Sequence, residues 1–142
     1  MKAVSIQTVI FLIALFFASC AKKEAPGTPQ DVVVGTWQLY QTATDDNNNH
    51  ILDDQELRTL ATGDKETYVF YRNYSGQQTV NYFGALSTYA LNWSLFEGSR
   101  YMQIVKLGRD TQNYTVVKFS PIDLTLLDTV GTTYSWYILK KQ

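Results

Sequence analysis

Residues 45–56 hold a dense group of side-chain oxygens that could bind a metal ion. Asp45, Asn47 and Asn49 stand at alternate positions, and the carboxylates of Asp53 and Glu56 follow in the same stretch. Calcium prefers about six to eight hard oxygen ligands, which carboxylates, amides and backbone carbonyls supply. The spacing therefore favours a calcium site, because an ordinary turn does not require oxygens at alternate positions.

This stretch resembles the calcium loop of an EF-hand. The resemblance implies a structural calcium ion bound by six residues, which are Asp45, Asn47, Asn49, Asp53, Glu56 and, through its backbone carbonyl, Ile51. His50 stands where such loops carry glycine, so we expect it to adopt a strained positive φ.

A simpler interpretation uses some of the same residues. Residues 45–56 could be a solvated turn that leads into a short helix, with Asp53 as the N-cap and Glu56 as its capping-box partner. Gly63 would then end that helix. This alternative leaves the oxygens at Asp45, Asn47 and Asn49 without a purpose, so we favour calcium.

Other reactive residues are few, and we expect no enzymatic activity. The chain has one histidine and one cysteine, which excludes a histidine pair for a metal hydrolase and leaves His50 as a loop residue instead of a zinc ligand. No glycine-rich phosphate loop occurs. Outside residues 45–56, no pair of carboxylates has a spacing that would place both in one cleft.

The chain begins with the pattern of a secretory signal peptide, which we assign to residues 1–19. Lys2 is followed by an uncharged apolar run over residues 9–18, too short to span a bilayer of about 30 Å as a helix. Residues 20–30 contain lysines, glycine and two prolines, a composition typical of a flexible tether. The folded domain is therefore expected over residues 31–142.

The end of the signal, Phe17-Ala18-Ser19-Cys20, resembles the lipobox of bacterial lipoproteins. The resemblance implies that Cys20 carries a diacylglyceryl group and a fatty-acyl amide such as palmitate. Two or more acyl chains give stable membrane anchoring. Because Ala21 follows Cys20 in place of a retention aspartate, we expect the protein to be anchored in the outer membrane, on either face.

The elements that would position these residues are strands. Trp37 and Leu39 alternate with polar neighbours in a first strand over residues 32–40, the period of a half-buried strand. Seven further strands are expected at residues 66–72, 77–83, 88–96, 100–106, 113–119, 124–129 and 132–140, most of them joined by short turns. Pairing the last strand with the first would remove both sheet edges, so we expect an all-β, eight-stranded, antiparallel up-and-down barrel.

The inward face of this barrel defines a candidate ligand site. Alternation along residues 88–96 and 100–106 directs six side chains inward, those of Tyr89, Leu91, Trp93, Leu95, Met102 and Ile104. Small eight-stranded barrels are either filled by such side chains or keep room for one small ligand. The last strand is apolar on both faces, so its periodicity does not orient it.

Three features resemble the lipocalin-like lipoproteins of Bacteroidota: Gly35-Thr36-Trp37 on the first strand, Trp93 with Leu95 in the middle, and the ending Ile138-Leu139-Lys140-Lys141. The resemblance implies that Gly35 and Trp37 close one end of the barrel against a cation from the last strand, either Lys140 or Lys141. It also implies a small hydrophobic ligand inside the barrel.

Two functions remain open at this point. The first is a lipid-anchored, lipocalin-like protein that binds a small apolar ligand and holds a structural calcium ion. The second is a surface module with a filled barrel that binds protein or glycan through exposed tyrosines such as Tyr40, Tyr71 and Tyr74. The net charge of −1 gives no electrostatic reason to bind nucleic acid, and we expect a monomer.

Overall fold

Nine β-strands make up most of the protein, for which a computed structural model describes residues 27–142. The expected signal peptide, Cys20 and most of the tether lie outside the described residues. The strands are β1 (Gly35–Thr44), β2 (Leu57–Thr59), β3 (Lys65–Phe70), β4 (Ser75–Tyr82), β5 (Ala85–Phe96), β6 (Tyr101–Lys106), β7 (Thr111–Phe119), β8 (Asp123–Val130) and β9 (Thr133–Lys141).

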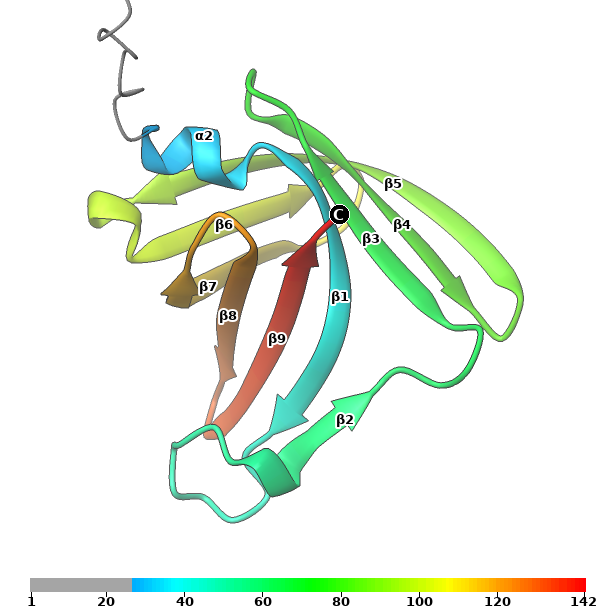
Figure 1. Cartoon of the computed structure of the whole chain (residues 1–142), viewed down its shortest axis with the longest axis vertical. Coiled ribbons are helices and arrows are strands. Elements are labelled where there is room, and N and C mark those ends of the chain that lie inside the picture. The colour runs from blue at the N-terminus through cyan, green and yellow to red at the C-terminus, as the bar shows by residue number, and fades with distance from the viewer. Residues whose placement is uncertain (1–26) are drawn as a thin grey trace, which may run out of the picture.

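The strands form one closed antiparallel barrel, as predicted. Each strand from β3 onward pairs with the next, and β9 returns to pair with β1, beside which it lies in Figure 1. β2 and β3 occupy the same edge of β1: β3 pairs with its first residues, Gly35 to Gln38, and β2 with Gln41 to Ala43. The two short strands therefore share one position, and the barrel is eight-stranded.

A short helix, α2 (Pro29–Val33), precedes the barrel where the sequence predicted tether and the start of a strand. Thr28 caps this helix in a reciprocal capping box with Asp31, and Pro29 supplies the fixed φ of a first helical position. Val33 is fully buried. The predicted strand start at residue 32 is therefore wrong, because these local capping signals outweigh the β-propensity of the valines.

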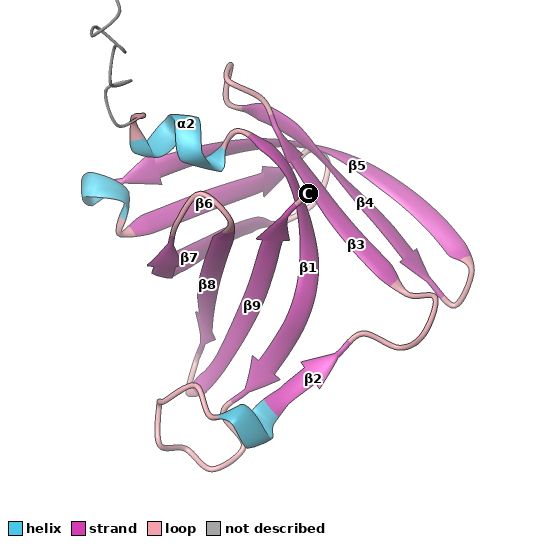
Figure 2. Ribbon diagram, in the orientation of Figure 1, coloured by secondary structure: helices cyan, strands magenta, loops and turns pink. Residues whose placement is uncertain are grey.

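The predicted helix after residues 45–56 is present only as a single 3-10 turn, η2 (Asp54–Glu56), which Figure 2 shows beside β2. Asp53 precedes it but makes no capping hydrogen bond through its side chain. β2 begins directly at Leu57. The capping-box alternative that ended at Gly63 is therefore wrong, since pairing with β1 holds Leu57 in a strand.

The apolar core fills the end of the barrel next to α2. Side chains from every strand except β2 and β4 meet in one buried cluster, whose members include Val33, Trp37, Phe70, Leu91, Trp93, Met102, Ile104, Tyr114, Leu124 and Leu139. Figure 1 shows α2 and the loop of residues 45–56 at opposite ends of β1. We call the end covered by α2 the closed end and the other the open end. Among residues 27–142 no helix is long and apolar enough to cross a membrane.

Each face of β9 carries one buried residue, and the two faces meet different parts of the protein. Leu139 belongs to the core cluster, so alternation places Trp136 on the outer face of the barrel. Trp136 is only 3% exposed, although it lies outside the core cluster. Tyr134 stacks on the same face, and the ring of His50 lies 4.2 Å from that of Tyr134. The loop of residues 45–56 therefore folds back against the outer face of β9.

Candidate ligand-binding cavity at the open end of the barrel

A cavity of about 300 Å³ lies beyond the apolar core. Phe70 pairs with Gly35 beside α2, so Glu66 lies toward the other end of β3 and places the cavity toward the open end. The cavity is lined by Glu66, Tyr68, Gln78, Val80, Tyr82, Tyr89, Lys106, Arg109, Gln112, Tyr114 and Tyr137. The lining is mainly polar and aromatic, and three of its residues carry charge.

Glu66 is the buried acidic group of this cavity and is only 8% exposed. Its Oε1 accepts hydrogen bonds from the Tyr68 hydroxyl and the Gln78 amide, and its Oε2 accepts one from the Tyr82 hydroxyl. A buried carboxylate is costly unless hydrogen bonds satisfy it. These three donors therefore hold Glu66 in place, and Glu66 in turn fixes the orientation of the tyrosines.

Four tyrosines of the cavity, at positions 68, 82, 114 and 137, remain protonated at neutral pH. Burial raises the pKa of Tyr68, Tyr82, Tyr114 and Tyr137 above the ordinary value, and the negative charge of Glu66 raises each of them further. Asp128 adds to this effect at Tyr114 and Tyr137. The phenols therefore act as neutral hydrogen-bonding groups.

One polar atom in the wall has no partner. The amide of Gln78 is 3% exposed and donates through Nε2 to Glu66 and to the Tyr68 hydroxyl. Its Oε1 is buried and makes no hydrogen bond to any of residues 27–142. Buried acceptors are nearly always satisfied by protein, water or a ligand, so this oxygen is a candidate acceptor for a donor from outside the protein.

Two cations stand on the β6–β7 side of the cavity. The Arg109 guanidinium lies 4.4 Å from the centre of the Tyr89 ring, a cation–π contact that fixes its plane. Neither Arg109 nor Lys106 belongs to an ion pair found among residues 27–142. Their charges are therefore available to a ligand.

The six residues expected to line a ligand site separate into two groups. Tyr89 lines the cavity. Leu91, Trp93, Met102 and Ile104 are at most 2% exposed and belong to the core cluster, and Leu95 packs against that cluster while partly buried. These five residues lie on β5 and β6 at the filled end of the barrel, so they belong to the core. The inward face of β5 continues from there into the cavity, where it presents Tyr89. Alternation identified the face correctly but not the depth at which the filling ends.

The sequence analysis did not single out the polar residues of the cavity. One signal for them exists in the alternation Glu66, Tyr68, Phe70, which places a carboxylate on the inward face of β3. Gln78 and Tyr82 alternate in the same way on β4. A polar side chain at an inward position of a barrel strand indicates either a buried network or a binding site.

The closed end is sealed around Trp37, which is fully buried. Its indole N–H donates to the Val33 carbonyl over 2.6 Å. Of the two candidate cations it is Lys141 that lies over the Trp37 ring, at 5.3 Å, while its ammonium donates to the Val32 carbonyl. Gly35 has φ +132°, and a Cβ there would come within 2.8 Å of Lys141 Cε, so a side chain would disturb this seal.

The loop of residues 45–56 is organised around Asp45. Its carboxylate accepts the backbone N–H groups of Asn49 and His50, each over 3.0 Å, and also contacts His50 Nδ1 at 2.9 Å. Burial acts to raise the pKa of Asp45, but these hydrogen bonds outweigh it and lower the pKa below its usual value. His50 has φ +60°, the strained conformation that its position predicted.

The other expected calcium ligands come together in part. The amides of Asn47 and Asn49 both donate to Asp53 Oδ2, over 3.0 and 2.7 Å. Glu56 is 5% exposed; its Oε1 accepts the Asp46 N–H, whereas its Oε2 is buried without a partner. Ile51 is exposed and donates its N–H to Asn49 Oδ1. Within residues 27–142, no three acidic, histidine or cysteine side chains gather closely enough to hold a metal ion.

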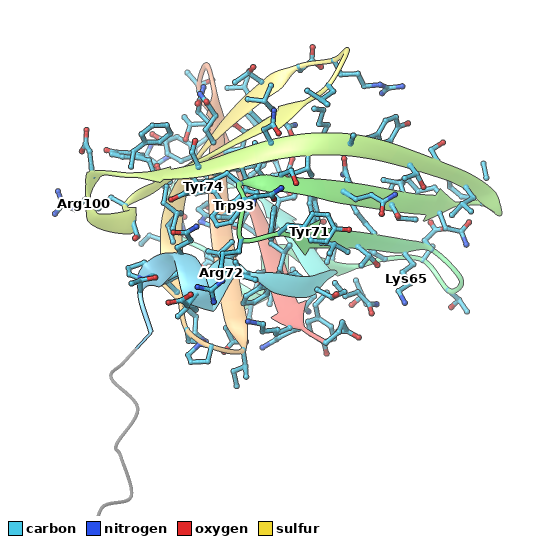
Figure 3. The ribbon with its side chains drawn as sticks, turned by 90° about the horizontal axis from the view of Figure 1, so that it is seen from above. Lys65, Tyr71, Arg72, Tyr74, Trp93 and Arg100 are labelled. Carbon is cyan, nitrogen blue, oxygen red and sulfur yellow. The ribbon has the colours of Figure 1, made fainter. Side chains whose placement is uncertain are left out.

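The exposed tyrosines of the second function lie on separate elements. Tyr40 is on β1, whereas Tyr71 and Tyr74 are in the connection between β3 and β4; all three are about half exposed. Figure 3 shows Tyr74 beside Trp93, and their ring centres are 5.3 Å apart. The Tyr74 hydroxyl also donates to the side chain of Gln30 in α2. Tyr74 is therefore engaged in packing at the closed end.

Comparison with solved structures classifies this architecture. A lipocalin-like protein from Bacteroides uniformis matches 78% of this chain and 99% of its own, with a TM-score of 0.58 and 20% sequence identity. The fold is lipocalin-like. A redesigned β-barrel matches 84% of this chain and 99% of its own at 14% identity, with a TM-score of 0.48. No family model and no curated protein matches the chain.

Proposed function

We propose that this protein is a lipid-anchored, lipocalin-like member of the bacterial cell envelope that binds a small polar ligand at the open end of its barrel. The observation that carries the proposal is the cavity itself, in which the Gln78 acceptor and the cations Lys106 and Arg109 have no hydrogen-bond or ion-pair partner, respectively, within residues 27–142. Its volume of about 300 Å³ is at the lower limit of typical ligand pockets.

The polar lining changes the expected ligand. An apolar molecule would leave Gln78 Oε1 unsatisfied and would remove the charges of Lys106 and Arg109 from water without compensation. Five of the six side chains that were expected to receive an apolar ligand, all except Tyr89, instead belong to the core or pack against it. A ligand with its own hydrogen-bonding groups fits this cavity better.

The proposed anchor at Cys20 suits this function. The described part of the chain begins at Gly27 and enters α2 at the closed end. A tether to an acylated Cys20 would therefore leave from the end opposite the cavity, so the open end would face away from the membrane. Ligands could then enter from the aqueous side.

We also propose that the loop of residues 45–56 holds a structural calcium ion. All of its candidate ligand atoms are oxygens, and the observation that most favours a bound cation is Glu56 Oε2, which is buried and has no partner in the described part of the chain. Asn47, Asn49 and Asp53 already meet at one point, and rotation of either amide would present its oxygen there in place of its nitrogen. Bound calcium would fasten the loop over Trp136 on the outer face of β9.

The ligand proposal is tested by native mass spectrometry of the purified protein after incubation with the small-molecule fraction of a bacterial extract. Val80 lines the cavity from β4, so Val80→Phe should fill the space without adding a polar group. We expect adducts on the parent protein that are lost in Val80→Phe. If the two proteins retain the same adducts, or neither retains any, the cavity is not a ligand site.

A further inference from the structure

The chemistry of the cavity identifies a class of ligand, an inference that rests on the proposed function. We infer that the cavity binds a sugar acid of monosaccharide size, with its carboxylate against Arg109 and Lys106 and a hydroxyl donating to Gln78 Oε1. The inference depends on where the charges lie, on the aromatic wall and on the one unpartnered acceptor.

The charges fix the orientation of the ligand. Arg109 and Lys106 stand at the turn between β6 and β7, whereas Glu66 lies on β3 and Asp128 on β8, and the charges of both carboxylates act on Tyr114 and Tyr137. An anionic group is therefore attracted to the β6–β7 side and repelled elsewhere. Because Tyr89 holds the guanidinium plane of Arg109, the planar group can offer paired N–H donors to a carboxylate.

The acidic side of the cavity selects neutral donors over a cationic group. Glu66 already accepts three hydrogen bonds, from Tyr68, Gln78 and Tyr82, so both of its carboxylate oxygens are engaged. The free acceptor is the neutral oxygen of Gln78. A hydroxyl group can donate to that oxygen, whereas an ammonium group would need more acceptors than this wall offers.

The aromatic wall suits the remaining surface of a sugar. Five tyrosines line the cavity, at positions 68, 82, 89, 114 and 137. Each offers an apolar ring face together with a hydroxyl, which matches the alternation of C–H and O–H groups around a sugar ring. A fatty acid would satisfy Arg109 but would place its chain among polar groups, and a volume of about 300 Å³ leaves little room for a long chain.

The test is calorimetric titration of D-glucuronate and D-glucose, which differ in the carboxylate, into the parent protein and Arg109→Gln. Arg109 is exposed on the turn after β6, so its replacement should not affect folding. We expect glucuronate to bind the parent more tightly than glucose does. Arg109→Gln should weaken glucuronate binding about tenfold or more, the loss typical of a charge-assisted hydrogen bond, and should leave glucose binding unchanged.

Arg100→Gln is the matched control, since it removes the same charge from the turn between β5 and β6 at the closed end. Figure 3 shows Arg100 at the opposite edge of the molecule from Lys65, the first residue of β3. This variant should bind both sugars as the parent does. Equal binding of the two sugars by the parent, or no binding of glucuronate at about 10 mM, would overturn the inference. The proposed function would survive either result if native mass spectrometry still showed adducts that Val80→Phe removes.

Discussion

At the scale of single residues, β5 shows how one strand face serves two purposes. Leu91 and Trp93 are buried in the core, and Tyr89, the next inward residue toward the open end, lines the cavity. The indole N–H of Trp93 donates to the backbone carbonyls of Tyr71 and Ser75, each over 3.1 Å. Trp93 is therefore a structural residue that ties the connection between β3 and β4 to the core.

Replacement of Trp93 should test this assignment. Trp93→Ala should lower the free energy of unfolding by about 3–5 kcal/mol, because it leaves a cavity among Phe70, Leu91 and their neighbours. Urea denaturation measures the change. Leu86→Ala, on the same strand but 70% exposed, should change the free energy by no more than about 0.5 kcal/mol. A loss below about 1 kcal/mol in Trp93→Ala would show that the side chain is not part of a packed core.

At the scale of elements, the loop of residues 45–56 is fastened to the barrel at both ends. Asp45 N–H donates to the Tyr134 carbonyl, and β2 pairs with β1 immediately after η2. Between these points the ring of His50 lies on Tyr134. Calcium in this loop would therefore stabilise the β1–β9 closure instead of switching the barrel between two states.

Calcium should raise the melting temperature of the protein. Amides at Asn47 and Asn49 and the strained φ of His50 argue for a Kd of about 10⁻⁴–10⁻³ M. At millimolar calcium this corresponds to roughly 0.4–1.4 kcal/mol of added stability and a rise of a few degrees. Glu56→Gln should abolish the rise. His50→Gly should increase the affinity, because glycine adopts a positive φ without strain and frees Asp45 from the imidazole.

Differential scanning calorimetry of the three proteins, with calcium, magnesium or chelator, measures these effects. Magnesium serves as the control, since it demands a near-ideal octahedral site and dehydrates reluctantly. An identical melting temperature of the parent protein in calcium and in chelator would rule out the site.

A group of ion pairs links β7, β8 and β9 at the closed end, and its contribution to the free energy of unfolding depends on pH. Lys140 hydrogen-bonds Asp123, and Lys118 contacts its other oxygen at 2.9 Å. These two contacts, that of Lys140 first, lower the pKa of Asp123 below the ordinary value of about 3.9. Because folding lowers the pKa of Asp123, the ion pairs stabilise the protein fully at a pH above the ordinary value. This stabilisation is lost as the pH falls through the lowered pKa of the folded state.

Asp123→Asn should therefore reduce the free energy of unfolding at pH 7 but have a smaller effect near pH 3. Urea denaturation at both values measures the difference. Asp110→Asn, at an exposed carboxylate that forms no ion pair found among residues 27–142, is the control and should show no such dependence. An equal loss in Asp123→Asn at both values would mean that the carboxylate acts through its packing and not through its charge.

At the scale of the whole molecule, the two ends of the barrel have different roles. The closed end contains the core, the Trp37 seal and α2, and the open end contains the polar cavity. The chain enters at the closed end. An anchor before α2 would thus hold the protein at a membrane without covering the cavity.

Replacement of the proposed acylation site should release the protein from the membrane. Cys20→Ser should prevent acylation, because serine lacks the thiol that forms the thioether, and should leave an unprocessed or soluble protein. Fractionation of cells, followed by a high-salt wash of the membranes, measures the distribution. A mutant that stays in washed membranes would exclude lipid anchoring through Cys20.

The sequence by itself determined the class of fold. Alternation of apolar and polar residues, as at Trp37 and Leu39, has the period of a strand, and eight strand positions joined mostly by short turns leave few topologies other than a closed barrel. It also predicted the positive φ of His50, because the position of a residue within a turn imposes its backbone conformation. These are local properties, which neighbouring residues suffice to encode.

Only the tertiary structure showed where the side chains stop filling the barrel interior and which parts of the outer surface are covered. Tyr89 and Leu91 are equivalent in an alternating pattern, yet the barrel interior is filled around one and open beside the other. Trp136 is as suited to the core as Leu139, yet it is buried on the outer face, where Tyr134 stacks beside it and His50 of the loop lies against Tyr134. Glu66 became a candidate only when β3 and β4 brought Tyr68, Gln78 and Tyr82 to it. Such contacts depend on the distances between strands. The sequence pattern predicts which face of the sheet a side chain occupies, but it does not predict how far along the barrel the side chain lies.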